Sequence, residues 1–356
     1  MTTIASPRRR IALIAPARYP IREPYAGGLE AFCHTLVRAL RELGHSVDLY
    51  AARGSQGHVV GYELPGVDWA GQPLSASDTG YPPGARETED AAFVALLRHL
   101  AVAGYDRVHN NSLTPRMFST EVDLPMLTTL HTPALPEMQE AIAAAGPRAG
   151  RFAAVSATTA ADWELPAPAT VIPNGVDTLA WREGPGGRSA VWFGRIVPEK
   201  GLHLAMDACR LVGIPLVFAG RVGDHRYFST QIVPRMTGKA ATWVGELDHR
   251  GLRALVSLSR VCLVTPRWEE PFGLVAFEAM SCGTPVAAFR RGGLGELLAD
   301  APASLAEPDD VESLAASVLV AAGIDRALAR QWVINHHSLT EVARRYAGLY
   351  SEVTTR

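Results

Sequence analysis

The stretch 265–289 reads TPRWEEPFGLVAFEAMSCGTPVAAF and places two carboxylates, Glu270 and Glu278, on either side of a Pro-Phe-Gly turn. The apolar run after the turn predicts a helix that stops at the Gly-Thr-Pro sequence 283–285. Because the first amides of a helix point out of its first turn, the start of this helix is a ready site for a phosphate group. Glu270 and Glu278 lie roughly 10 Å apart along the axis at about 1.5 Å per residue. This separation suits two polyol groups that flank a diphosphate better than it suits one shared metal ion.

The Glu-x7-Glu pattern in EPFGLVAFEAM, followed by CGTPVAAF and the Gly-Gly pair 292–293, resembles the retaining GT-B glycosyltransferases of the glycosyltransferase family 4 type, also called glycosyl transferases group 1. The resemblance implies an α/β fold with two Rossmann-like, doubly wound parallel-sheet domains that face a cleft. It also implies that Glu270 contacts the hydroxyls of the donor sugar and that Glu278 holds the ribose. The amides that would meet the sugar and the diphosphate are those of Phe272, Gly273 and Leu274. Without the resemblance, the alternative is an ordinary amphipathic helix with solvated carboxylates.

The composition is that of a protein with two ordinary domains. The chain has 356 residues, of which 47% are hydrophobic and 20% charged, and one domain of this length would be oversized. The 34 basic and 36 acidic residues give a net charge of −2, which indicates neither a nucleic-acid partner nor a strongly anionic membrane partner. Peripheral membrane contact is left open. Four widely spaced cysteines without a CxxC pair predict buried thiols in a reducing compartment.

The N-terminal arginines 8–10 invite interpretation as a targeting signal. The apolar run after them, 11–15, is too short for the hydrophobic region of a secretory signal. No stretch of the sequence approaches the roughly 18 to 20 apolar residues of a membrane span. We therefore expect a cytoplasmic protein.

The first half of the chain begins with a strand, a loop, a helix and a second strand, at 11–17, 19–28, 29–44 and 46–51. Such units build a parallel sheet whose ligands lie beyond the carboxyl ends of the strands. The Gly27-Gly28 pair falls in the loop on that side, and the resemblance implies that Gly28 lies close to the diphosphate and the acceptor. A plain turn at the start of the helix is the alternative. The pair is not part of a GxGxxG fingerprint, and no Walker lysine pattern occurs.

A histidine, His131, directly follows the predicted strand 126–130 and therefore lies where ligand-facing residues gather. The resemblance implies a hydrogen bond from this position to the donor sugar, often at its 6-hydroxyl. The alternative is a structural histidine. His109, at the end of another predicted strand, is a weaker candidate. The turn-rich region 53–84 predicts surface loops beside the cleft, where acceptor specificity would reside.

The string VIPNGVD at 171–177 resembles the crossover of the family into its second domain. Its Pro and Asn-Gly are turn residues, and the glycines of 184–187 indicate a linker. The expected domains are therefore an acceptor-binding domain at 1–172 and a donor-binding domain at 173–335. A C-terminal helix within 336–356 is expected to pack back on the first domain.

Two cations at the start of the second domain, Arg195 in FGR and Lys200 in EKG, match the residues with which the family binds the donor diphosphate. Two fixed cations can stabilise a departing nucleoside diphosphate without a metal ion. A lysine at the start of a helix is electrostatically unfavourable, so a bound anion is the better explanation for Lys200 at this position. Since no Asp-x-Asp occurs, we expect no metal and no other cofactor. The resemblance makes Arg221 and Val244 neighbours of the nucleobase.

The sequence departs from the family where relatives have a small serine before the first glutamate. Here Pro266 is followed by Arg267, Trp268 and Glu269, which places a bulky cation and an extra acid beside the donor. Glu269 is also a rival for the role of Glu270. The spacing to the second glutamate and the following Pro-Phe-Gly favour Glu270.

These features predict a retaining, metal-independent glycosyltransferase. It would move a hexose-type sugar from a nucleotide diphosphate sugar, UDP-linked as the first hypothesis and GDP-mannose as the second, to a hydroxyl of a sugar, a lipid or a small natural product. Glu270 and His131 are the expected catalytic residues. Three alternatives stay open: a sugar phosphorylase of the same fold, an enzyme that couples an aminocyclitol in an antibiotic pathway, and a non-catalytic nucleotide-sugar-binding protein.

Overall fold

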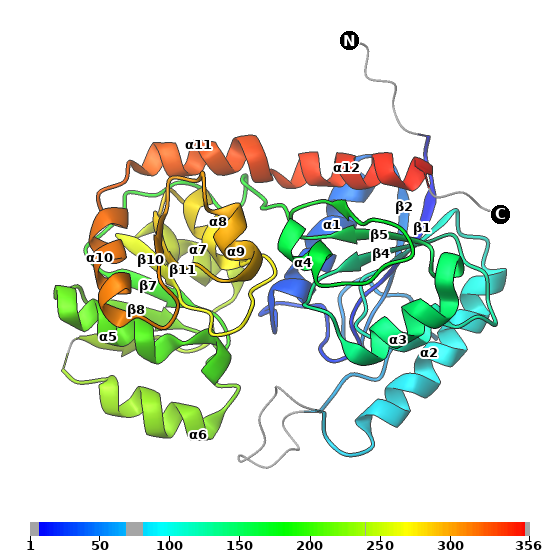
Figure 1. The fold of residues 1–356 in the computed structure, drawn as a ribbon, viewed down its shortest axis with the longest axis horizontal. Helices are drawn as coiled ribbons and strands as arrows, with labels where there is room; N and C mark the ends of the chain where they lie inside the picture. Colours follow the sequence, from blue (N-terminus) through cyan, green and yellow to red (C-terminus); the bar gives the residue numbers. More distant parts are fainter. Residues whose placement is uncertain (1–6, 69–80, 239, 353–356) are drawn as a thin grey trace, which may run out of the picture.

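The chain forms two parallel β-sheets of six strands each, which lie side by side with helices around them (Figure 1). The computed structural model describes residues 7–68, 81–238 and 240–352, so part of the predicted loop region 53–84 lies outside the described residues. Every strand pair in the described residues is parallel. This arrangement confirms the predicted α/β fold with two doubly wound domains.

The first sheet has the strand order β2-β1-β3-β4-β5-β6. Its strands are β1 (Arg10–Ile14), β2 (Ser46–Tyr50), β3 (Arg107–Asn110), β4 (Met126–Leu130), β5 (Arg151–Ala154) and β6 (Thr170–Val171). The α-helices between these strands are α1 (Gly28–Glu42), α2 (Ala85–Val102), α3 (Pro136–Ala145) and α4 (Ala157–Ala161), with the short 3₁₀ helices η1 (Pro115–Phe118) and η2 (Gly146–Ala149).

The second sheet has the order β12-β11-β10-β7-β8-β9. Its strands are β7 (Ala190–Phe193), β8 (Leu216–Ala219), β9 (Ala241–Trp243), β10 (Val261–Val264), β11 (Val286–Phe289) and β12 (Ser304–Ala306). Its helices are α5 (Leu202–Val212), α6 (His225–Tyr227), α7 (His249–Ser257), α8 (Leu274–Ser281), α9 (Gly292–Leu297) and α10 (Val311–Ala321), with the short segments η3 (Pro198–Lys200), η4 (Phe228–Ile232) and η5 (Val233–Arg235).

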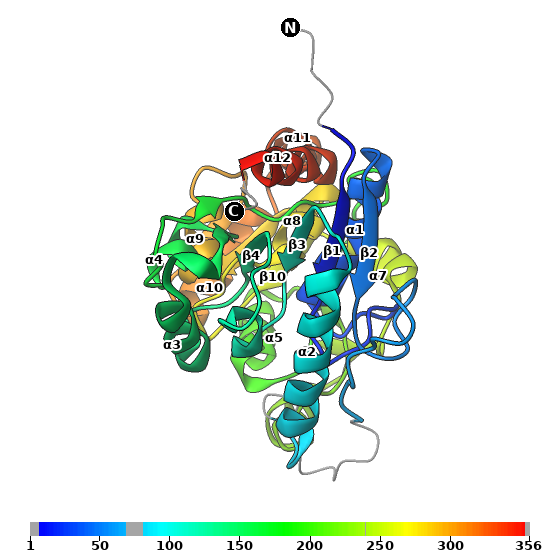
Figure 2. The same ribbon diagram turned by 90° about the vertical axis from the view of Figure 1, so that its right-hand side faces the viewer.

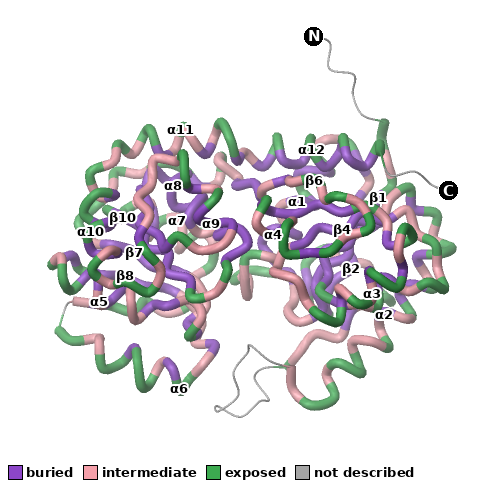
Figure 3. Tube along the Cα trace, in the orientation of Figure 1, coloured by how far each residue is buried: buried purple, intermediate pink, exposed green. Residues whose placement is uncertain are grey.

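Burial on both faces explains why the central strands are continuous apolar runs. All four residues of β10 and all four of β11 are buried, as expected for parallel strands covered by helices on both sides. Figure 3 shows buried segments at the centre of each half and exposed segments around them. The four cysteines Cys33, Cys209, Cys262 and Cys282 are free and buried. No helix in the described residues is long and apolar enough to cross a membrane, so the cytoplasmic location stays a prediction.

Two C-terminal helices connect the domains. Helix α11 (Arg326–His337) lies on the second domain and α12 (Leu339–Glu352) lies on the first. Figure 1 shows both along one edge of the molecule, and Figure 2 shows them nearly end-on. Val342, Tyr346 and Tyr350 of α12 belong to the same buried cluster as residues of β1 and α1. The C-terminal helix therefore contributes to the core of the first domain.

The chain passes between the domains twice, and the two crossovers touch. Val176 donates its amide to the carbonyl of His337 at 2.8 Å, and Leu339 donates its amide to the carbonyl of Val176 at 3.0 Å. A Cβ on Gly175 would lie 2.7 Å from Cα of Leu339, so this glycine allows the two backbones to approach. Any movement of one domain against the other has to bend both crossovers at this point.

The glycine-rich segment 184–187 is packed against the second domain instead of forming a free linker. The amide of Gly186 donates to the carbonyl of Ser257 at 3.0 Å. A Cβ on Gly187 would lie 2.1 Å from the carbonyl oxygen of Leu258. Glycine is needed at 184 and 187 because a side chain there would collide with the end of α7 or with the residue after it. The segment is therefore packed and not flexible, and the linker interpretation was wrong.

Candidate active site

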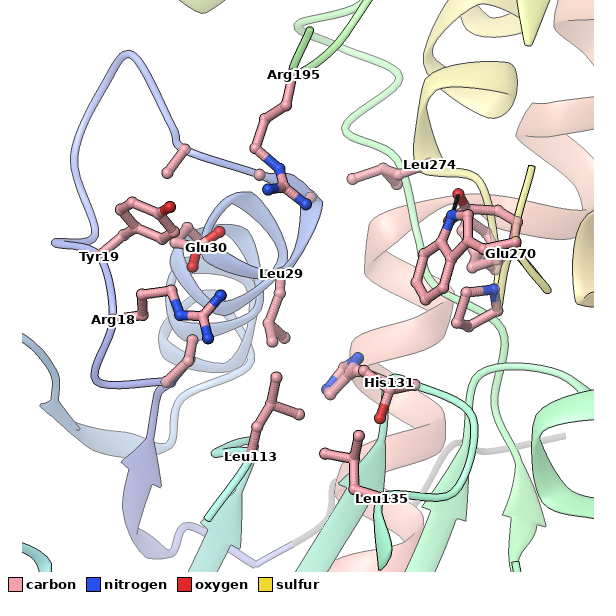
Figure 4. Close-up of a pocket in the computed structure, with 18 of the residues that line it drawn as sticks. Arg18, Tyr19, Leu29, Glu30, Leu113, His131, Leu135, Arg195, Glu270 and Leu274 are labelled. Atoms are coloured by element: carbon pink, nitrogen blue, oxygen red, sulfur yellow. Dashed lines mark hydrogen bonds between the residues drawn. The ribbon is translucent and has the colours of Figure 1, made fainter. Parts of the chain in front are cut away.

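A cavity of about 1010 Å³ opens between the two domains at the carboxyl ends of both sheets. The first domain contributes Gly28 and His131 to its wall, and the second contributes Arg195, Lys200 and Glu270. Figure 4 shows His131 and Glu270 on one side of the cavity and Arg195 with Glu30 on the other. The structure thus brings together, in one space, residues that lie up to 242 positions apart in the sequence.

Glu270 lies in the loop between β10 and α8, with only 9% of its surface exposed. Its Oε2 accepts a hydrogen bond from Nζ of Lys200 at 2.6 Å and another from the indole N–H of Trp268 at 3.0 Å. The neighbouring Glu269 points away from the cavity: its side chain is 57% exposed and lies 3.5 Å from a guanidinium nitrogen of Arg291. The geometry therefore favours Glu270 over Glu269 as the carboxylate that meets a ligand.

The turn before α8 presents its backbone to the cavity. Gly273 is the N-cap residue with φ of +80°, and the helix start has no side-chain cap, which leaves its first amides for a ligand. Phe272, Gly273 and Leu274 all line the cavity. The positive φ of Gly273 favours glycine, and a Cβ there would also lie 2.6 Å from a methyl group of Leu294, which would have to shift.

Lys200 ends the short 3₁₀ helix η3 and does not belong to the first turn of α5. The two helices are separated by Gly201, which has φ of +64° and whose Cβ would lie 2.2 Å from the carbonyl oxygen of Thr265. The hydroxyl of Thr265 also donates to the carbonyl of Lys200 at 2.9 Å. Lys200 is therefore fixed against the end of β10, beside the loop that carries Glu270.

Arg195 follows β7 and lines this cavity as well as a smaller one beside it. A guanidinium nitrogen lies 3.8 Å from a carboxylate oxygen of Glu199. With Lys200, it provides two positive charges near the start of α8, an arrangement that can hold a diphosphate.

His131 follows β4 and is neutral at physiological pH, because burial lowers its pKa to about 3. Its Nε2 lies 3.0 Å from Oδ1 of Asn111, and the amide nitrogen of Asn111 donates to the carbonyl of His109 at 3.3 Å. Asn111 therefore presents an acceptor to the ring, so the proton of His131 is on Nε2 and Nδ1 is an acceptor. The ring packs edge-on against Phe32 at 4.9 Å between centroids. His131 can accept a hydrogen bond from a hydroxyl but cannot supply a positive charge.

His109 is a structural residue. It is fully buried, and its two ring nitrogens lie 2.8 Å from the hydroxyls of Tyr350 and Thr129. It joins the first sheet to the C-terminal helix and does not line the cavity.

Glu278 lies on α8 and lines the smaller cavity, of about 120 Å³, that shares Gly28 and Arg195 with the larger one. Burial raises its pKa to about 8, so the carboxyl is protonated at neutral pH in the ligand-free protein. Arg221 lines the same small cavity, whereas Val244 lines neither of the two and is 41% exposed. The structure brings Arg221 and Glu278 into the lining of one small cavity but does not bring Val244 to either cavity.

Among the residues of the cavity wall that sequence reasoning missed are two buried polar ones. Glu30, on the first turn of α1, is 6% exposed, and burial raises its pKa against the opposing effect of Arg195, Arg18 and Arg221. Asn174, in the first crossover, is 7% exposed, and its Oδ1 is buried without a hydrogen-bond partner in the described residues. A glutamate soon after Gly-Gly and an asparagine at a domain crossover were the available signals. Neither signal was specific, because a glutamate is common in the first turn of a helix and an asparagine is common in a turn.

The two parallel-sheet domains and the cavity between them are the arrangement of the GT-B fold. The family described as Glycosyltransferase Family 4 matches residues 26–179, and the family described as Glycosyl transferases group 1 matches residues 182–335. Together these matches extend over nearly the whole chain. The chain belongs to the group 1 glycosyltransferases of the family 4 type.

Two relatives with known names are similar to the chain in sequence. A glycogen synthase of Mycobacterium tuberculosis (strain ATCC 25618 / H37Rv) is 36% identical over 160 residues, 42% of this chain, and the chain spans only 38% of that protein. A D-inositol 3-phosphate glycosyltransferase of Acidothermus cellulolyticus is 27% identical in an alignment of 365 positions, which covers 83% of this chain and 79% of the relative.

Among solved structures, sucrose-phosphate synthase from Thermosynechococcus elongatus has a TM-score of 0.74 at 23% identity, over 97% of this chain and 99% of that one. This likeness supports the GT-B fold.

Proposed function

We propose that this protein transfers a hexose-type sugar from a nucleotide diphosphate sugar to an acceptor hydroxyl, with retention of configuration at the anomeric carbon. The proposal is supported by the convergence of Glu270, Lys200, Arg195 and His131 on one cavity, with Glu278 in the adjoining one. A UDP-sugar is the first donor to test and GDP-mannose the second.

Each group has a part that follows from its chemistry. Arg195 and Lys200 bind the diphosphate and stabilise the negative charge that grows on it as it leaves. Glu270 accepts hydrogen bonds from sugar hydroxyls and orients the ring, and neutral His131 accepts one through Nδ1. Glu278, in the smaller cavity, holds the ribose. Its protonated carboxyl can both donate to and accept from the two ribose hydroxyls.

In the reaction, the bond between the anomeric carbon and the diphosphate oxygen breaks through an oxocarbenium-like, ion-paired state. The acceptor oxygen forms its bond to the anomeric carbon on the same face, and the acceptor proton passes to the departing phosphate. The protein contributes position and electrostatic stabilisation, and no covalent nucleophile is required.

Metal independence is part of the proposal. Its support is the presence of two cationic side chains at the expected diphosphate position, which can balance the charge of the leaving group. Activity that survives a chelator such as EDTA is the expected result. Full loss that Mg²⁺ restores would refute this part of the proposal and leave the transfer reaction itself standing.

A thermal-shift panel with UDP, GDP, ADP and TDP, followed by their common sugar conjugates, tests the donor. A ligand that binds only the folded state raises the unfolding midpoint. We expect one nucleotide to raise the midpoint and one of its sugar conjugates to raise it further, with sugar transfer to an acceptor in a separate assay. Phosphorolysis of a disaccharide without any nucleotide would instead identify a phosphorylase. Binding without turnover across a wide acceptor panel would identify a nucleotide-sugar-binding protein.

A further inference from the structure

The loop between β10 and α8 directs only one of three consecutive side chains into the cavity. Arg267 turns outward, and its Nε donates to Oδ1 of Asp309 at 2.8 Å. Glu269 turns outward toward Arg291. Trp268, between them, lines the cavity together with Glu270. The departure of this loop from the family therefore reaches the donor side of the cleft through the indole of Trp268.

Trp268 and Lys200 share one oxygen of Glu270. The indole N–H donates to Oε2 at 3.0 Å, and the lysine ammonium donates to the same Oε2 at 2.6 Å. The ammonium also lies 5.1 Å from the centroid of the indole ring, within the range of a cation–π contact. No hydrogen bond from the described residues reaches Oε1 of Glu270, so this oxygen is the one available to a ligand.

The two donors differ in what they can do when a donor substrate arrives. Lys200 has a flexible stem and a compact charge that a diphosphate attracts. Trp268 has a rigid ring, and the backbone beside it is held by the amide of Arg267, which donates to the carbonyl of Glu199 at 2.7 Å. When Lys200 turns toward the diphosphate, only the indole still holds Oε2. A carboxylate held at one oxygen presents the other in a fixed direction.

We propose that Trp268 is a positioning residue for sugar transfer: its N–H fixes Oε2 of Glu270, so that Oε1 faces the donor sugar while Lys200 serves the diphosphate. This inference rests on the proposed function, because it assigns Glu270 to the sugar and Lys200 to the diphosphate. It predicts that the indole N–H matters for the sugar and not for the nucleotide.

The test uses Trp268→Phe, which keeps an aromatic ring and removes the N–H. A hydrogen bond to a charged group is worth about 1.5–3 kcal/mol, so kcat/KM for the nucleotide sugar should fall about tenfold to a hundredfold. The affinity for the nucleoside diphosphate alone, by calorimetry, should stay within about twofold of wild type. Trp332→Phe is the matched control, because Trp332 is also half-buried but lines neither cavity, and it should leave both quantities unchanged.

A second measurement shows whether Trp268 acts through Glu270. On a Glu270→Ala background, Trp268→Phe should cause no further loss, because coupled residues are not additive. Unchanged kcat/KM in Trp268→Phe, or equal losses for the sugar conjugate and for the bare nucleotide, would overturn the inference. A wild-type protein that binds nucleotide sugars without transferring the sugar would instead contradict the proposed function. Even in that case, the inference about Trp268 can be tested by binding: Trp268→Phe should weaken binding of the nucleotide sugar and leave binding of the bare nucleotide unchanged.

Discussion

Replacing Glu270 with glutamine should change nucleotide affinity and turnover in opposite directions. In the ligand-free protein Glu270 is paired with Lys200 at 2.6 Å, with 11% and 27% of the two side chains exposed. An exposed ion pair contributes up to about 1 kcal/mol, and breaking a fully buried one costs about 3–5 kcal/mol. Because this pair is largely but not fully buried, we expect it to contribute about 1–2 kcal/mol. A diphosphate that recruits Lys200 has to overcome this contribution.

Glutamine is nearly isosteric, and its amide oxygen can still accept the hydrogen bond of the Trp268 indole. It removes the ion pair and a negative charge next to the diphosphate position. The nucleoside diphosphate should therefore bind about fivefold or more tightly. The same change removes the charged acceptor for the sugar hydroxyls, so single-turnover transfer should slow by about tenfold to a hundredfold. Calorimetry with UDP and GDP and rapid-quench transfer with the matching sugar conjugate measure the two effects.

Glu269→Gln is the matched control, because Glu269 is adjacent, exposed and directed toward Arg291. It should leave both measurements unchanged. The tighter binding in Glu270→Gln should also shrink at high salt, since it is electrostatic in origin. If nucleotide affinity and turnover fell by the same factor, Glu270 would belong to the nucleotide and the reasoning from the ion pair would be wrong.

Three further predictions concern other parts of the molecule. Lys200→Ala should weaken nucleoside diphosphate binding about tenfold in calorimetry, the low end for a charge-assisted contact because the lysine leaves an existing partner; unchanged affinity would remove it from the site. Burial raises the pKa of Glu278 to about 8, so the folded state holds its proton more tightly, and this group costs stability as pH rises from about 5 to 8. Glu278→Gln should therefore gain a few degrees in Tm relative to wild type over that range, while losing nucleotide affinity; a constant Tm difference would contradict the assigned pKa. Gly175→Ala should lower stability by about 1–3 kcal/mol, because its Cβ would meet the backbone of Leu339, whereas Gly348→Ala has open space on a helix and should raise it by about 0.5–1 kcal/mol.

The parts of the fold that sequence reasoning predicted are those encoded locally. The central parallel strands are covered on both faces, so β10 and β11 appear as uninterrupted apolar runs that stand out from the amphipathic helices. The choice of Glu270 over Glu269 was local as well, because the spacing to Glu278 and the turn after it were readable. The structure adds the reason: the two neighbouring side chains point in opposite directions.

The contacts that sequence reasoning could not give join residues far apart along the chain. The sequence predicts separate parts for Lys200 and Glu270, one at the diphosphate and one at the sugar, and only the fold shows that the two side chains pair across 70 positions. The sequence predicts Lys200 at the start of a helix, but a short 3₁₀ helix ends at Gly201, where the carbonyl oxygen of Thr265 comes so close that a side chain would not fit. The burial of Glu30 among arginines from both domains depends on how the domains face each other, which no local pattern encodes.

The pairing of Lys200 with Glu270 also bears on which anions the cleft can accept. Cations gathered in a cleft repel one another, and carboxylates such as Glu270 and Glu30 offset that repulsion while the site is empty. A ligand that brings only a diphosphate can satisfy Lys200, but it leaves Glu270 without its cation and close to another negative charge. A nucleotide sugar brings the diphosphate for Lys200 and the hydroxyls for Glu270, so it replaces both halves of the pair at once. We therefore expect the cleft to prefer a sugar conjugate over a bare anion, because the unconjugated ligand leaves the buried carboxylate of Glu270 with the Trp268 indole as its one remaining hydrogen-bond donor among the described residues.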